Sequence, residues 1–162
     1  MREGAATLGR VRLLVLLLLV CSLCALAASV RPANALPPQK FRARANALCV
    51  SYYADIVAIA KRLQPHDLAS LVKFQQVGHA RAVRFVRQLK RVVPPQPLAA
   101  EFRRFVALLG QSNSLDGPIV AAAKRGDATA VARLASREIA LDGSIKKSAR
   151  RMSLNACANP PR

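Results

Sequence analysis

An apolar residue recurs every three or four positions across residues 41–63, and this helical period constrains the fold more than any other feature of the sequence. Seven residues carry it: Phe41, Ala45, Leu48, Tyr52, Ile56, Ile59 and Leu63. Side chains at steps of three and four lie on one face of an α-helix. The stretch therefore predicts an amphipathic helix that buries one face against the rest of the domain.

Three more segments show the same period, and no strand-like alternation is present. The second helix is expected to begin near residues 65–67, since proline suits a first turn and Asp67 favours a helix N-terminus, and to continue to about Val92, where a run of prolines stops it. The third begins at Leu98 and falters over residues 110–118, where we expect a kink or a short loop before a piece at 119–124. The fourth runs over residues 128–154, after a Gly-Asp stop and cap. These patterns predict an all-α, up-and-down bundle of four main helices, with the third kinked or broken.

Residues 1–35 are interpreted as a signal peptide or signal anchor. Arg2, Arg10 and Arg12 precede an apolar run at residues 13–26, and small residues at Ala33 and Ala35 form the preferred cleavage site, with a second at residues 25–27. Residues 36–40 then form a Pro-containing spacer, and residues 41–158 form the bundle domain. We expect the domain to be exported across the plasma membrane.

The alternative to cleavage is a retained anchor. Residues 13–30 carry no charge and are just long enough to span a bilayer, so the membrane would be reached through them if the signal stays uncleaved. Lipidation at Cys21 or Cys24 is disfavoured by the bulky residues before them, Val20 and Leu23. The domain is secreted or periplasmic in one case and membrane-anchored on the outside in the other.

Cys49 and Cys157 are the two cysteines that follow the N-terminal segment. In an antiparallel four-helix bundle, the start of the first helix and the end of the last lie at the same end. Exported proteins meet oxidising conditions and rarely keep paired cysteines reduced. The sequence therefore predicts a Cys49–Cys157 disulfide.

Short motifs in this chain resemble those of small exported helical proteins of high-GC bacteria. These motifs are an Ala-Asn-Ala-Leu-Cys start at residues 45–49, a Pro94-Pro95 step before Phe102 and Phe105, and a C-terminal cysteine, Cys157. The resemblance covers most of residues 41–158. It implies a disulfide-linked helical bundle and supplies no activity.

Groups able to carry out catalysis are few. After residue 35 the chain has seven acidic residues and two histidines, His66 and His79. No haem attachment motif, paired-cysteine zinc motif, phosphate loop or nucleophile elbow occurs, and no Glu-x-x-His pattern predicts a di-iron site. We therefore expect a protein that is not an enzyme and that has no metal site and no cofactor.

Positive charge dominates the chain, with 26 Lys and Arg against 8 Asp and Glu and a formal net charge of +18. Without residues 1–35 the balance is 22 against 7. Such a surface attracts anionic lipid headgroups or an envelope polymer, although a plain solvated surface explains the charge equally well. Nucleic acid is disfavoured by export and by the lack of surface aromatics, and the oligomeric state is left open. The candidate anion-binding residues are Arg81, Arg84, Arg87, Lys90, Arg91, Arg103, Arg104, Lys146, Lys147, Arg150 and Arg151.

An alternative function is an interhelical pocket for a hydrophobic or haem-like ligand. Tyr52 and Tyr53 occupy the first helix, His79 lies in the middle of the second, and Glu138 interrupts the apolar stripe of the fourth. A buried carboxylate at Glu138 requires a cation such as an arginine, in an ion pair or at the edge of a pocket. Tyr52, Tyr53, His66 and His79 are the side chains that could ligate haem.

Overall fold

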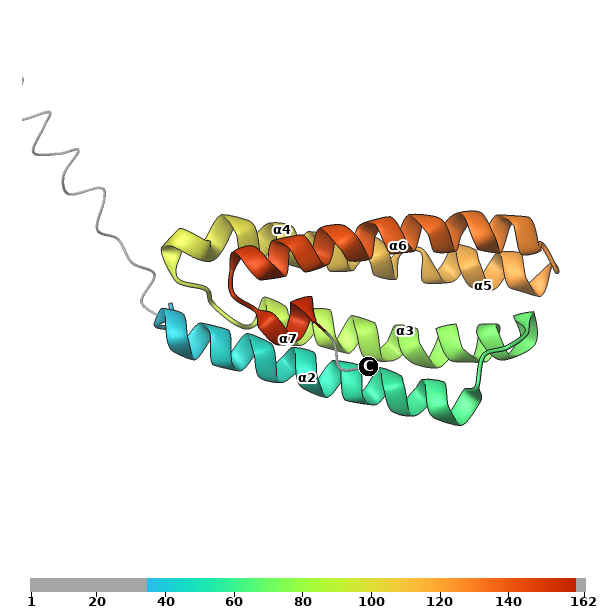
Figure 1. Ribbon diagram of the computed structural model, residues 1–162, viewed down its shortest axis with the longest axis horizontal. Coiled ribbons are helices and arrows are strands. Elements are labelled where there is room, and N and C mark those ends of the chain that lie inside the picture. Colours follow the sequence, from blue (N-terminus) through green and yellow to red (C-terminus); the bar gives the residue numbers. More distant parts are fainter. Residues whose placement is uncertain (1–34, 160–162) are drawn as a thin grey trace, which may run out of the picture. The chain divides into compact units, whose positions relative to one another are not determined.

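The computed structural model describes residues 35–159, which form helices and no strand. Five longer helices follow one another as α2 (Pro38–Leu63), α3 (Leu68–Lys90), α4 (Ala99–Asn113), α5 (Asp116–Lys124) and α6 (Ala128–Arg151). A short 3-10 helix, η1 (Gln96–Leu98), precedes α4, and a last short helix, α7 (Asn155–Ala158), ends the chain. Because α4 and α5 together make the third member, the predicted four-helix bundle with a broken third helix is confirmed (Figure 1).

The predicted signal segment lies outside the described residues except for Ala35. Cys21, Cys24 and the apolar run at residues 13–30 belong to that undescribed part. Among the helices of residues 35–159, none combines the length and the apolar character needed to cross a membrane.

The first helix begins three residues earlier than predicted, at Pro38. Proline suits the first position of a helix because the N–H that it lacks would have no intrahelical partner there. The backbone N–H of Phe41 donates to the Pro37 carbonyl at 2.9 Å, which closes the first turn. Residues 38–40 of the expected spacer are therefore helical, and the Pro38 that seemed to delay the helix starts it.

Side-chain caps fix the start of α3 and of α6. Asp67 and Ser70 form a capping box at α3, in which Ser70 N–H donates to Asp67 Oδ1 at 2.7 Å. Asp127 caps α6 by accepting from Ala130 N–H at 2.9 Å. Gly126 precedes this cap with a φ of 70°, a conformation that glycine adopts without strain. The Asp127 cap agrees with the predicted start of the last helix, and α3 begins at Leu68, just after the expected start at residues 65–67.

The third and fourth helices end differently from the prediction. The break in the third helix is confined to Ser114 and Leu115, so residues 110–113 still belong to α4 and residues 116–118 form the first turn of α5. The fourth helix ends at Arg151, and Ser153 adopts a left-handed φ of 59°. This reversal directs residues 155–158 into α7, an element that the apolar period gave no reason to expect because it is a single turn.

The helices pack as neighbouring pairs, α2 with α3, α3 with α4 and α5, and both α4 and α5 with α6. Helices α2 and α6 do not form a packed pair, and α7 contacts both of them (Figure 1). The main core lies at the end where α2 begins, with the Phe41 and Phe102 rings edge to face at 5.1 Å. The fully buried large side chains in this core are Phe41, Phe105, Leu89, Met152, Leu154, Cys49 and Cys157.

The predicted Cys49–Cys157 disulfide is confirmed, with Cα atoms 5.2 Å apart across 108 positions of sequence. Two hydrogen bonds support the same junction. Asn46 Oδ1 accepts from Ala156 N–H at 3.0 Å, and Arg42 Nε donates to the Met152 carbonyl at 3.1 Å. The bridge is consistent with an oxidising location.

Candidate anion-binding surface and interhelical depressions

Helices α2 and α4 begin, and α3 and α6 end, at the same end of the bundle (Figure 1), and the segments that meet there are rich in lysine and arginine. Within residues 38–44, 84–91, 99–104 and 147–151, Glu101 is the one acidic residue. We call the cations of these four segments the basic end: Lys40, Arg42, Arg44, Arg84, Arg87, Lys90, Arg91, Arg103, Arg104, Lys147, Arg150 and Arg151.

Three of the predicted anion-binding residues are paired with carboxylates: Arg81, Lys146 and Arg151, of which the first two are only partly exposed. Arg81 Nη1 lies 3.6 Å from Asp55 Oδ2, and Lys146 Nζ lies 2.6 Å from Asp142 Oδ2. Opposite charges at these distances reduce the attraction that either cation exerts on a ligand. Apart from Arg81 and Lys146, the predicted residues are exposed and belong to the basic end.

The cations of the basic end surround the bundle and do not form one flat face. Helix α4, with Arg103 and Arg104, packs against both α3 and α6, whereas α3 and α6 are not a packed pair. The candidate anion-binding residues named from the sequence do not include the α2 cations Lys40, Arg42 and Arg44, although the last two fall within the predicted first helix. Because α2 begins at Pro38, Lys40, Arg42 and Arg44 lie in its first two turns, at the same end as the cations of α3, α4 and α6.

A small depression of about 140 Å³ lies between α4 and α6 at the basic end. Arg104, Lys147 and Arg151 line it together with Glu101 and two serines, Ser144 and Ser148. The buried Ser148 hydroxyl donates to Glu101 Oε1 at 2.7 Å, and Arg151 Nη1 lies 3.6 Å from Glu101 Oε2. Glu101 therefore offsets part of the positive charge here and holds the two helices together.

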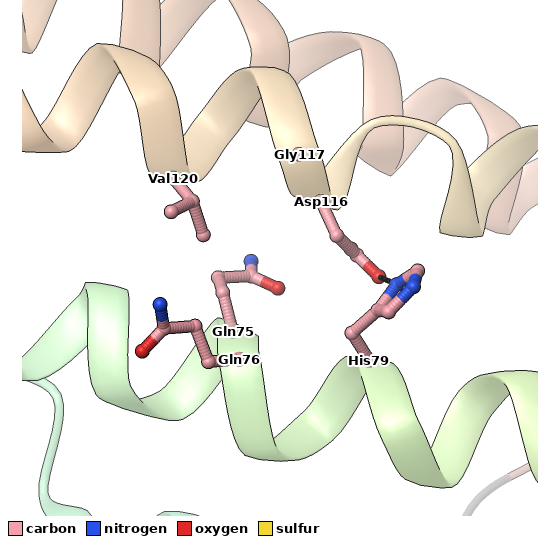
Figure 2. Close-up of a pocket in the computed structure, with 6 residues that line it drawn as sticks. All are labelled: Gln75, Gln76, His79, Asp116, Gly117 and Val120. Atoms are coloured by element: carbon pink, nitrogen blue, oxygen red, sulfur yellow. Dashed lines mark hydrogen bonds and ion pairs between the residues drawn. The ribbon is translucent and has the colours of Figure 1, made fainter.

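His79 on α3 and Asp116 on α5 form a polar contact on another side of the bundle (Figure 2). Nδ1 of His79 lies 2.7 Å from Oδ2 of Asp116, whose side chain is 11 % exposed, while the His79 side chain is 48 % exposed. Burial raises the pKa of Asp116, and the contact with His79 acts in the opposite direction. The pair lines a depression of about 280 Å³ together with Gln75, Gln76, Gly117 and Val120.

Two of the other predicted pocket residues lie near the His79–Asp116 pair, since the charge of Asp116 adds to the burial that raises the pKa of Tyr52 and of Glu138. Tyr53 donates its hydroxyl to the Cys157 carbonyl at 3.3 Å, and burial raises the pKa of Tyr53 to about 12. Tyr52 stacks on Phe85 with ring centroids 4.4 Å apart, and burial raises the pKa of Tyr52 as well. His79 lines the depression beside Asp116.

Glu138 is half-buried on α6, and burial raises the pKa of Glu138, with smaller contributions from the nearby charges of Asp116 and Asp142. In residues 35–159 no Lys or Arg nitrogen lies within ion-pairing distance of its carboxylate. The expected cation partner is therefore absent from the described part of the chain. His66, the remaining candidate haem ligand, has a side chain that is 77 % exposed at the start of α3.

A larger and mostly apolar depression, of about 630 Å³, lies between the first half of α3 and the end of α5. Its lining residues are Leu68, Ala69, Val72, Lys73, Gln76, Ala123, Lys124 and Gly126. Gln76 also lines the depression beside His79, so the two adjoin. Sequence reasoning missed this site because it depends on how α5 packs on α3. The one sequence feature that points to this depression is the run of three alanines at residues 121–123, whose small side chains leave space between packed helices.

No group of three or more His, Cys, Asp or Glu side chains in residues 35–159 is arranged to hold a metal ion. Comparisons of the chain with protein-family models, with curated proteins and with solved structures find no match.

Proposed function

We propose that the protein binds an anionic component of the cell envelope through its basic end and has no catalytic role. The observation that carries this proposal is the segregation of charge along the bundle. That end carries twelve exposed or partly exposed cations, from the terminal segments of four helices, and within the same segments one acidic residue, Glu101. Clustered cations attract dense negative charge far more strongly than the same cations spread among acids.

The ligand chemistry that fits is a surface or polymer bearing many phosphate groups. Cations that ring the end of a bundle can approach a planar layer of headgroups end-on, and can equally be wrapped by a flexible polymer. Each lysine or arginine close to an anionic membrane contributes about 1 kcal/mol. Export and a membrane or wall location form part of the same proposal.

Covalent connection adds support for a membrane-facing end. Residue Leu36 lies at the basic end, where its N–H donates to the Val93 carbonyl at 3.2 Å. Whatever precedes residue 36 therefore joins the domain at this end. If residues 13–30 stay in the bilayer, the basic end is the part of the domain nearest to the headgroups.

A pair of charge-matched variants tests the proposal. The first changes Arg87, Arg91, Arg104 and Arg150 of the basic end to Glu. The second changes Lys61, Arg62, Arg125 and Arg133, which are exposed and lie toward the opposite end, to Glu. Both variants have the same net charge, so a difference between them reports the position of the charge and not its amount.

The measurement is co-sedimentation of residues 36–162 with vesicles that contain phosphatidylglycerol or phosphatidylcholine, at low and high salt. We expect binding to the anionic vesicles alone, weakening as salt screens the charges. The first variant should lose more than about a hundredfold in affinity and the second much less. A soluble polyphosphate chain distinguishes polymer from lipid as the ligand. Equal loss in both variants, or equal binding to neutral vesicles, would refute the proposal.

A further inference from the structure

A second surface, distinct from the basic end, has the features of a ligand site. It is the depression between α3 and α5 that Leu68, Val72, Ala123, Lys73 and Lys124 help to line. Its volume of about 630 Å³ is within the usual range of small-molecule sites. This surface lies toward the end of the bundle opposite the basic end, where α3 begins and α5 finishes.

The depression exists because the side chains between the two helices are too small to fill it. Helix α5 presents Ala123, and the turn that follows contributes Gly126. On α3, Ala69 is exposed. Leu68 and Val72 are large apolar residues in the first turns of this helix, and both stay partly exposed. Apolar surface that the fold leaves in water is stabilised when an apolar ligand covers it.

Two ammonium groups flank these apolar walls. Lys73 on α3 and Lys124 at the end of α5 both line the depression and are exposed. Neither has a carboxylate within ion-pairing distance among residues 35–159. An apolar wall beside two unpaired cations is complementary to a molecule with an apolar chain and an anionic head.

The adjoining depression limits how such a molecule lies. There the His79 imidazole and the Asp116 carboxylate are hydrogen-bonded to each other, and Gln75 and Gln76 contribute neutral amide side chains. That end therefore offers no unpaired positive charge to an anionic head. The head has its better partners at Lys73 and Lys124.

We infer that the depression binds a single-chain anionic amphiphile of the fatty-acid type. The hydrocarbon chain covers Leu68, Ala69 and Val72, and the carboxylate lies between the ammonium groups of Lys73 and Lys124. This inference is independent of the proposed function, because no residue of the basic end takes part. Binding here depends on chain length, whereas binding at the basic end depends on the density of negative charge.

The experiment is isothermal titration of residues 36–162 with dodecanoate below its micelle concentration. Octanoate and dodecanol serve as comparison ligands. We expect saturable binding of dodecanoate, weaker binding of octanoate by about tenfold or more because fewer methylenes are buried, and weaker binding of dodecanol because it lacks the charge. Octanoate or dodecanol binding as tightly as dodecanoate would overturn the inference, as would no saturable binding of dodecanoate.

Matched variants locate the site. Ala69→Trp fills the depression, whereas Ala80→Trp adds the same side chain to an exposed alanine of α3 that does not line it. Ala69→Trp should weaken dodecanoate binding by about tenfold and Ala80→Trp should not. Lys73→Gln with Lys124→Gln should weaken it by about fivefold, and Lys61→Gln with Lys90→Gln should not.

Each result has a clear meaning. Equal effects of Ala69→Trp and Ala80→Trp would place the ligand elsewhere and overturn the inference. Helical circular dichroism of every variant confirms that the fold is retained. The vesicle assay on Ala69→Trp separates the two proposals, since binding through the basic end should be unchanged in that variant whether or not dodecanoate binds.

Discussion

His79 Nδ1 and Asp116 Oδ2 lie 2.7 Å apart and join α3 to α5 across 37 positions of sequence. The carboxylate is largely buried, and the imidazole is its hydrogen-bond partner in the described part of the chain. Burial of a carboxylate is unfavourable unless a hydrogen bond or a cation compensates. The position of α5 against α3, and with it the two adjoining depressions, therefore depends partly on this one contact.

Replacing His79 by Leu should lower the free energy of unfolding by about 1–3 kcal/mol, because the buried carboxylate of Asp116 loses its partner. Replacing both residues by Leu should recover most of that loss, since no unpaired polar group remains. Urea unfolding followed by circular dichroism measures both. His66→Leu is the control, because the His66 side chain is 77 % exposed, and it should change stability little. A double variant as unstable as His79→Leu would contradict this account.

The same substitution should have a pH-dependent effect. Burial raises the pKa of Asp116 in the folded protein, so the folded state holds the proton more tightly than the unfolded state. The unfolding free energy contributed by this group is then highest in acid and falls as pH rises through the interval between the two pKa values. The cost of His79→Leu should accordingly be larger at neutral pH than at a pH where Asp116 is protonated. An equal cost at both pH values would show that the carboxylate charge is not involved.

Glu138 gives a second test with the same sign. Burial raises its pKa above the ordinary value of 4.5, and no cation is paired with it among residues 35–159. Glu138→Gln should therefore raise the free energy of unfolding at neutral pH and have little effect in acid, where the wild-type side chain is also neutral. Urea unfolding of the two proteins at both pH values checks this. A variant that is less stable than wild type at neutral pH would show that the carboxylate has a favourable partner in solution.

Removing the disulfide should cost a large part of the stability. Replacing Cys49 and Cys157 by Ala opens a loop of 108 positions, which corresponds to about 4–5 kcal/mol in the chain-entropy description. The single Cys49→Ala variant should lose a similar amount, because either change breaks the bridge. Urea unfolding with and without a reducing agent provides the measurement. Reductant should destabilise the wild type and leave the double variant unchanged, and an unaffected wild type would contradict the prediction.

Two glycines should respond to alanine with opposite signs. Gly78 lies inside α3, where an added Cβ would meet Ile56 Cδ1 at 3.9 Å, an ordinary contact distance. Gly78→Ala should therefore stabilise the protein by about 0.5–1 kcal/mol through helix propensity. Gly126 has a φ of 70°, so Gly126→Ala should destabilise it by about 1 kcal/mol. Thermal and urea unfolding of both variants would show the opposite shifts. If Gly78→Ala were less stable than wild type, α2 and α3 would pack more closely at this position in solution.

The fold was largely predictable because its signals are local. The apolar stripe from Phe41 to Leu63, the caps at Asp67 and Asp127 and the glycine at position 126 act within one or two turns of helix, and each appears where expected. The disulfide followed from the order of the helices, the two cysteines after residue 35 and the expected export into an oxidising compartment. The errors lie where local rules compete, as at Pro38, which stops a preceding helix but starts a following one.

The candidate sites were harder to predict because they depend on which helices become neighbours. The sequence supplied the cations but could not show that Arg81 pairs with Asp55 on α2, or that Lys146 pairs with Asp142 on α6. It also could not show the contact of Arg151 with Glu101 on α4. It placed Tyr52, Tyr53, His79 and Glu138 as one possible pocket. In the structure Tyr52 and Glu138 lie near Asp116, the partner of His79, but their main contacts differ: Tyr52 stacks on Phe85, and Tyr53 donates to the Cys157 carbonyl.

By itself the sequence determined the helical class, the number of main helices, the paired cysteines and the excess of positive charge. Each of these properties is fixed by residue types and by their spacing along one chain. The tertiary structure decided which charges stay unpaired, which carboxylates are buried and where small side chains leave apolar surface open between α3 and α5. Those outcomes depend on distances between residues far apart in sequence, and packing alone sets such distances.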